Sequence, residues 1–221
     1  MEEKERAIQK ILTNLLNRYP ILNECREEIE NAYGMIIRTY KGGGKLLVCG
    51  NGGSAADSQH IVGELMKGFK LKRQLTNEIK AKLTEYNNPE YREIGNLLAS
   101  KLQMPLKSIS LSAHSSLVTA FANDVGYEFA FAQQVLGYGE RGDTLIGIST
   151  SGNSTSVNNA IFTAKSLGLN TIGLTGKNGG KLKELCDITI LVPEDETYAI
   201  QELHLPVYHA LCAMTEMYFF G

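Results

Sequence analysis

The sequence predicts an α/β protein in which one parallel β-sheet is covered by helices on both faces. Short apolar runs alternate with segments of helical periodicity, which is the pattern of β–α–β units. A run such as 145–148 (Leu-Ile-Gly-Ile) is apolar at every position, as in strands that are buried on both faces. The 221 residues, 43% of them hydrophobic, can bury a sizeable core and suit one compact domain spanning 1–221.

Five apolar runs are expected to form the strands of this sheet. Each is short, and glycine or small polar residues follow several of them and end the strand. The expected strands are 46–49, 107–111, 143–148, 170–174 and 188–192.

Two helices precede the first strand, within residues 1–41. Apolar residues recur at helical spacing from Ile8 to Leu16 and again from Ile29 to Ile37. Three glycines at 42–44 end the second helix. The apolar faces of this hairpin must be buried on the sheet or on another subunit, and we expect part of the surface to be intersubunit.

The segment 70–106, between the first two strands, is the least transparent part of the chain. Helical patterns around 74–86 and 91–102 are separated by Asn-Asn-Pro at 87–89, and both are charged and weakly amphipathic. Two interpretations stay open for this insertion. It is a solvated peripheral hairpin, or it is a lid over the functional site.

Helices are also expected between the later strands. One ends at 123–124, a second lies between 126 and 137, and a third covers 155–167. A long final helix, from about 196 to 220, carries Gln201, His204 and His209.

Charge and cysteine content exclude several classes of function. The formal net charge is −2 and the pI near 6.1, so no global field attracts nucleic acid or an anionic membrane, and anion binding must be local. The cysteines are scattered without paired spacing, as is typical of reduced thiols: Cys25, Cys49, Cys186 and Cys212. The charged N-terminus is unlike a signal peptide, and no apolar run could span a bilayer. We therefore expect a soluble, cytoplasmic protein.

Two loops follow strands and lead into helices. The first is Gly50-Asn51-Gly52-Gly53-Ser54, in which Ser54 is the expected N-cap, and the second is Ser-Thr-Ser-Gly-Asn-Ser at 149–154. Helix N-termini of this kind attract anions, and both loops should lie at the carboxyl ends of the strands. The hydroxyl-rich second loop is the better phosphate site, and the first would orient sugar hydroxyls. Neither loop has a nucleotide P-loop ending.

The ionisable candidates lie on the helices after these loops. His60 and Glu64 are four residues apart, which places both on one helical face, and Glu64 could be a general base with a raised pKa. Gln201 and His209 are about 80° apart around the last helix, so both can face one cleft. His204 points elsewhere and is interpreted as structural.

These residues carry a resemblance to a known family. The matching elements are Asn51-Gly52-Gly53-Ser54 with His60 and Glu64, the 149–154 loop, Leu174-Thr175-Gly176, and Gln201-Glu202 with His209. Together they resemble the sugar isomerase (SIS) domain, and most closely the phosphoheptose isomerases. The resemblance implies a three-layer sandwich with a five-stranded parallel sheet and an N-terminal helical hairpin.

The resemblance further implies an activity and an assembly. It implies a homotetramer with intersubunit active sites that converts sedoheptulose 7-phosphate to D-glycero-D-manno-heptose 7-phosphate through an enediol, for heptose nucleotide synthesis. Glu64 and His209 would be the acid/base pair. Substrate would contact Asn51, Gly52, Gly53, Ser54, Glu64, Asn123, Asp124, Ser149, Thr150, Ser151, Ser154 and Gln201.

The resemblance also implies a zinc site with His60, Glu64, Gln201 and His209 as ligands, and no nucleotide or redox cofactor. A Glu64 bound to zinc would be a less free base, so the metal and acid/base roles compete. Two other functions stay open: a non-catalytic SIS protein that binds a phosphosugar or a replication initiator, and an isomerase of another phosphosugar.

Overall fold

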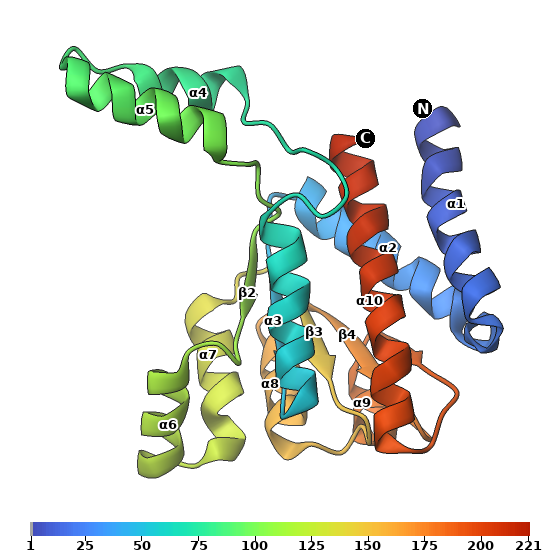
Figure 1. The fold of residues 1–221 in the computed structure, drawn as a ribbon. Helices are drawn as coiled ribbons and strands as arrows, with labels where there is room; N and C mark the ends of the chain where they lie inside the picture. The colour runs from blue at the N-terminus through green and yellow to red at the C-terminus, as the bar shows by residue number, and fades with distance from the viewer. Residues whose placement is uncertain (1) are drawn as a thin grey trace.

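The computed structural model describes residues 2–221 and shows a parallel five-stranded sheet with helices on both faces (Figure 1). The strand order is β2-β1-β3-β4-β5, and every neighbouring pair is parallel. The three-layer sandwich predicted from the sequence is therefore confirmed. The strands are β1 (Leu46–Gly50), β2 (Ser108–Ser110), β3 (Thr144–Ile148), β4 (Asn170–Thr175) and β5 (Ile188–Leu191).

Strand β3 shows why the strands are largely apolar. Leu145 faces one helical layer and Ile146 the other, because successive side chains of a strand point to opposite faces. β1, which lies between β2 and β3, is fully buried along its whole length. A polar side chain on either face of these strands would have to be buried.

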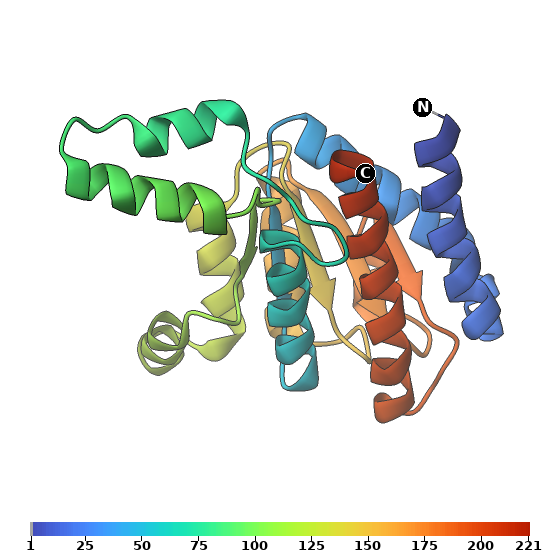
Figure 2. The same cartoon turned by 45° about the horizontal axis from the view of Figure 1, so that its top comes forward.

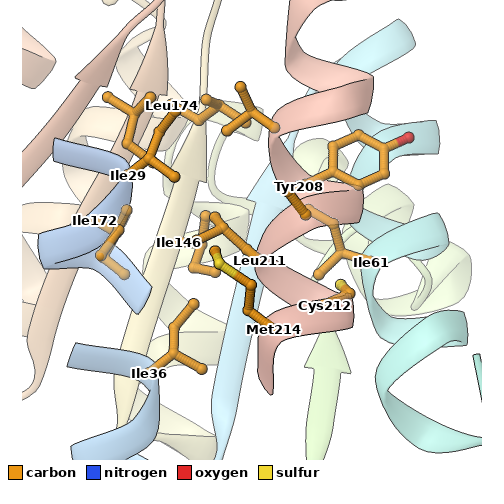
Figure 3. Close-up of a cluster of buried hydrophobic side chains, with 14 of the residues drawn as sticks. Ile29, Ile36, Ile61, Ile146, Ile172, Leu174, Tyr208, Leu211, Cys212 and Met214 are labelled. Carbon is orange, nitrogen blue, oxygen red and sulfur yellow. The ribbon is translucent and has the colours of Figure 1, made fainter. Parts of the chain in front are cut away.

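One layer consists of the N-terminal hairpin together with the helices that follow the first and the last strand. The elements are α1 (Glu2–Arg18), the short helix η1 (Pro20–Cys25), α2 (Arg26–Lys41), α3 (Gly53–Met66) and α10 (Thr197–Phe220). Figure 3 shows this core, in which side chains of α2, α3 and α10 meet the sheet around Ile146 and Ile172. Helix α1 packs on α10 through Leu12 and its apolar neighbours.

The opposite layer packs on the other face of the sheet, around Phe131, Val157 and Leu182. Its elements are α6 (Ser115–Asp124), η2 (Tyr127–Phe129), α7 (Ala130–Tyr138), α8 (Thr155–Ser166) and α9 (Gly180–Leu185). The bounds of α6, α7 and α8 agree closely with the three helices expected here, whereas η2 and α9 were not expected.

The insertion forms a helical arm of α4 (Asn77–Thr84) and α5 (Pro89–Lys101). Side chains cap both helices. The Thr76 hydroxyl accepts a hydrogen bond from the backbone N–H of Ile79 at 3.3 Å, and the side-chain carbonyl of Asn88 accepts one from the backbone N–H of Glu90 at 2.9 Å. Figures 1 and 2 show the arm extending away from the body, at the end of the sheet opposite the 149–154 loop. It does not cover the loops of its own chain.

A buried ion pair fixes the segment between α3 and the arm. Arg73 and Glu216 are each about 1% exposed, and their side chains meet at 2.8 Å. Glu216 also accepts from the backbone N–H groups of Phe69, Lys70 and Leu71, at 2.7, 2.7 and 3.0 Å. The Arg73 guanidinium donates to carbonyls at the end of α3. One charge pair therefore holds α3, α10 and the connecting segment together.

Candidate functional site

The two predicted anion loops meet at the carboxyl ends of β1 and β3. The Asn51 amide donates to the hydroxyls of Ser154 and Ser156, both at 2.9 Å. The Tyr127 hydroxyl donates to the Asn51 carbonyl oxygen. Tyr127 was not predicted to lie here, because no spacing rule joins residues 76 positions apart.

The first loop differs from the prediction in where its helix begins. The N-cap of α3 is Gly52, with φ of +54°, and not Ser54, which lies inside the first turn and is 4% exposed. The positive φ of Gly52, which glycine adopts without a steric penalty, lets the chain turn into the helix two residues earlier. Gly53 then faces α10 closely: a Cβ there would lie 2.5 Å from the Gln201 amide nitrogen.

The second loop, 149–154, leads directly into α8, whose N-cap is Ser154. Ser149 is buried, whereas Thr150, Ser151 and Ser154 are half-buried. Gly152 has φ of +66°, and a Cβ on it would collide with the Gly179 carbonyl, so the loop is folded tightly against the start of α9. This is the hydroxyl-rich helix N-terminus that the sequence predicts for a phosphate.

Asn123 and Asp124 form the end of α6, where the Asn123 amide donates to the Asp124 carboxylate at 2.9 Å. Both residues are exposed. They precede η2, which carries Tyr127 and its contact with Asn51. Their predicted role in substrate binding stays a prediction.

A second cluster lies farther along α3 and α10. His60 Nε2 is 3.2 Å from Glu64 Oε1 and 3.3 Å from His209 Nε2, so the predicted acid/base pair lies around one imidazole. The Lys67 ammonium contacts Glu64 Oε2 at 2.8 Å, and the Phe69 ring lies against His209 with ring centres 5.5 Å apart. Lys67 was overlooked, although its spacing of three from Glu64 predicts the contact.

The pKa of Glu64 differs in direction from the prediction. Burial raises this pKa, but the hydrogen bond and charge of Lys67, together with the nearby His60, outweigh burial and lower it below the ordinary value. The raised pKa expected from the sequence is therefore wrong, because that reasoning left Lys67 out. The pKa of His209 is lowered by burial and by His60, with Glu64 opposing. Near neutral pH the cluster holds a carboxylate and a neutral His209.

Gln201 lies apart from this cluster. Helices α3 and α10 run side by side in the same direction, with Gly53 level with Gln201 and His60 level with Tyr208. Eight residues of helix separate Gln201 from His209 by about 12 Å along the axis. The prediction considered only the angle around the helix and not this rise. Within one chain, the loops and Gln201 form one half-site, and His60, Glu64 and His209 form another.

The second half-site suits a divalent metal in its chemistry. Two imidazoles and a carboxylate are ordinary zinc ligands, and separations of 3.2 and 3.3 Å equal the donor–donor spacing of tetrahedral zinc, about 3.3 Å. Within residues 2–221, however, no group of three or more His, Cys, Asp or Glu side chains is already arranged to hold a metal ion. The pairs His60–Glu64 and His60–His209 therefore have separations suitable for zinc, but the three side chains are not arranged around one common point.

A cleft of about 640 Å³ opens beside His209, between α1 and α10. Lys70 and Arg18 contribute positive charge to it, and Asn14 and Asn17 contribute amides. The His60 side chain is 40% exposed and that of Glu64 14%, so the second half-site is accessible from outside the chain.

His204, interpreted as structural, is completely buried in α10. Its two ring nitrogens find no hydrogen-bond partner among residues 2–221, and burial lowers its pKa to about 4. None of the helices that the structure describes is both long and apolar enough to cross a membrane.

Comparisons with known proteins agree with the fold. Two models described as SIS domain match residues 12–93 and 109–219. Phosphoheptose isomerase of Aliarcobacter butzleri is 38% identical over 213 residues, which cover 96% of this chain and 97% of that protein. The corresponding enzyme of Helicobacter pylori strain P12 is 40% identical, with 90% and 88% covered.

Solved structures give the same result. The phosphoheptose isomerase of Neisseria gonorrhoeae superposes with a TM-score of 0.67 at 31% identity, covering 97% of this chain and 94% of that one. Because these relatives match along nearly their whole length, the chain belongs to the phosphoheptose isomerase family of SIS-domain proteins.

Proposed function

We propose that this protein is a ketose–aldose isomerase that converts sedoheptulose 7-phosphate to D-glycero-D-manno-heptose 7-phosphate through an enediol, a step of heptose nucleotide synthesis. Family membership supports a phosphosugar isomerase. The observation that carries the proposal is the placement of Glu64 and His209 around one imidazole, His60. An enediol needs one base at carbon and one group that moves a hydroxyl proton.

The charges of the cluster fit these two roles. Lys67 and His60 keep Glu64 ionised, so its carboxylate can remove the proton from C1 of the ketose and return it to C2. A neutral His209 can exchange a proton between the two hydroxyl oxygens. The phosphate, at the far end of a seven-carbon sugar, is assigned to the 149–154 loop and the N-terminus of α8.

We also propose that the complete site forms between subunits of a homotetramer. The two half-sites of one chain are about 12 Å apart along α10. The cleft of about 640 Å³ beside His209 is open to solvent on one chain, where a second copy could contact it. Such an arrangement would bring the partner's phosphate loop to this chain's acid/base pair.

Zinc is proposed at the second half-site, with His60, Glu64 and His209 as ligands from one chain. Gln201, the fourth predicted ligand, lies about 12 Å along α10 from His209, so it would join them from another copy of the chain. When bound, zinc would supply a Lewis acid that polarises the sugar carbonyl. The competition between the ligand and base roles of Glu64 remains, and metal analysis of protein purified without chelator tests occupancy.

The isomerase proposal is tested with a matched pair of variants. Sedoheptulose 7-phosphate is incubated with the parent protein, with His209→Gln and with His114→Gln, and NMR follows the aldose. His114 is an exposed histidine that stacks on Tyr138, outside both half-sites. We expect turnover by the parent and by His114→Gln and a loss of at least about 100-fold in His209→Gln. Equal turnover by all three contradicts the role of His209, and no turnover by the folded parent, with or without added zinc, contradicts the function.

A further inference from the structure

Tyr208 forms a bridge behind the second half-site. Its hydroxyl lies 3.0 Å from His60 Nδ1 and 3.2 Å from Asp57 Oδ1. The ring is 2% exposed and meets the His60 ring edge-on, with ring centres 5.5 Å apart. Figure 3 shows the ring beside Ile61 of α3, with its hydroxyl pointing away from the apolar core. The packed ring therefore fixes the position of the hydroxyl that faces His60.

When Asp57 is ionised, the hydrogen-bond donors and acceptors of these three groups fit together in one way. An ionised Asp57 carboxylate only accepts hydrogen bonds, and the Tyr208 hydroxyl has a single proton to give. Tyr208 therefore donates to Asp57, and His60 Nδ1–H donates to the tyrosine oxygen. The proton of a neutral His60 is then on Nδ1, and its Nε2 has a free lone pair.

That lone pair points into the cluster of Glu64 and His209. His60 Nε2 is 3.2 Å from the Glu64 carboxylate oxygen, and two acceptors at that distance repel each other unless a donor or a cation lies between them. The opposite tautomer, with the proton on Nε2, would satisfy Glu64 but would remove the lone pair that a ligand needs. The tautomer of His60 therefore decides what this half-site can bind.

We infer that Tyr208 is a positioning residue that, by relaying a hydrogen bond from Asp57, holds His60 in the Nδ1–H tautomer with Nε2 directed at Glu64 and His209. Asp57 supports this arrangement from α3. Its second oxygen, Oδ2, is buried and finds no partner among the residues that the structure describes, so the interaction with Tyr208 is the one that the carboxylate makes. Hydrogen bonds of this kind behind a ligating imidazole fix its tautomer and raise its basicity.

The inference rests on the proposed function only for its effect on catalysis, and its main test does not need activity. Long-range ¹H–¹⁵N NMR of the metal-free protein, at a pH where imidazole is neutral, distinguishes the two tautomers. His60→Gln identifies the His60 signal. We expect Nδ1–H for His60 in the parent, and a mixture of both tautomers in Tyr208→Phe, where the hydroxyl is lost and the ring kept.

Tyr218→Phe is the matched control, because Tyr218 lies on the same helix but packs on Phe219 and Lys4. It should leave the His60 spectrum unchanged. Zinc titration is the second readout, with an expected weakening of about 10- to 100-fold in Tyr208→Phe. An Nε2–H tautomer in the parent, or an unchanged tautomer in Tyr208→Phe, overturns the inference. A parent that binds no zinc contradicts the zinc proposal, while the tautomer result still decides the role of Tyr208.

Discussion

The buried pair of Arg73 and Glu216 offers the sharpest test of how the second half-site is held. Glu216→Gln keeps the shape of the side chain but removes its charge, which leaves the Arg73 guanidinium buried without a counter-ion. It also turns an amide N–H₂ toward backbone N–H groups that now donate to a carboxylate. Breaking one side of a buried ion pair costs about 3–5 kcal/mol of unfolding free energy.

For a chain of 221 residues, each kcal/mol lowers Tm by roughly 2–4 °C, so Glu216→Gln should lower it by roughly 6–20 °C. Thermal unfolding followed by circular dichroism measures this shift. The matched control is Glu30→Gln, which changes an exposed carboxylate paired with Arg26 on one helix face and should move Tm by less than about 2 °C.

A double variant separates lost charge from lost shape. Replacing both partners, as Arg73→Met with Glu216→Leu, removes the uncompensated charge and should recover part of the lost Tm. The backbone N–H groups of 69–71 would still lack their acceptor, so recovery should be incomplete. If Glu216→Gln melts at the same temperature as Glu30→Gln, the pair does not hold α3, α10 and the connecting segment together.

Three further predictions concern single sites. Gly53→Ala places a Cβ 2.5 Å from the Gln201 amide and should lower kcat/KM by about 100-fold with Tm unchanged; unchanged kinetics would contradict a role for this contact. Gly95→Ala places a Cβ 1.9 Å from the Leu83 carbonyl, so the arm should become protease-sensitive while turnover stays; lost turnover with a folded body would favour the lid. Because the pKa of His204 is about 4 in the folded protein, this imidazole takes up a proton in the unfolded chain first as pH falls from 6.5. Its contribution should therefore lower the free energy of unfolding by up to about 3 kcal/mol between pH 6.5 and 4. In His204→Phe, urea unfolding across that range should show a smaller decrease, and an equal decrease would contradict the assignment.

Local patterns predicted most of the fold. The strands follow from short continuous apolar runs, the two loops from the glycine and small polar residues after those runs, and the contact of His60 with Glu64 from the helical period of 3.6 residues. All of these signals operate within a few positions of the chain. The same reasoning misplaced the α3 N-cap at Ser54, because the positive φ of Gly52 is a backbone property that composition alone does not fix.

Contacts between distant segments could not be read in the same way. Tyr127 reaches Asn51 and Tyr208 reaches Asp57 because the sheet places their elements side by side, and no spacing in the sequence encodes either contact. The rise of the helix along α10 could have been calculated from the sequence, and this rise separates Gln201 from His209 along the axis although both face similar directions. The lowered pKa of Glu64 could also have been predicted, because Lys67 lies three residues after Glu64, a spacing that brings two side chains together on one helix face.

The most direct test of the account is isomerisation in D₂O. If Glu64 removes a proton from C1 of sedoheptulose 7-phosphate and returns it to C2, exchange with solvent at the carboxylate should place deuterium at C2 of the aldose, as NMR would detect. Glu64→Gln, with an unchanged Tm, should neither form the aldose nor incorporate deuterium into recovered ketose. Turnover by the parent without deuterium incorporation would argue against free exchange through an enediol, and full turnover by Glu64→Gln would contradict the assignment of the base.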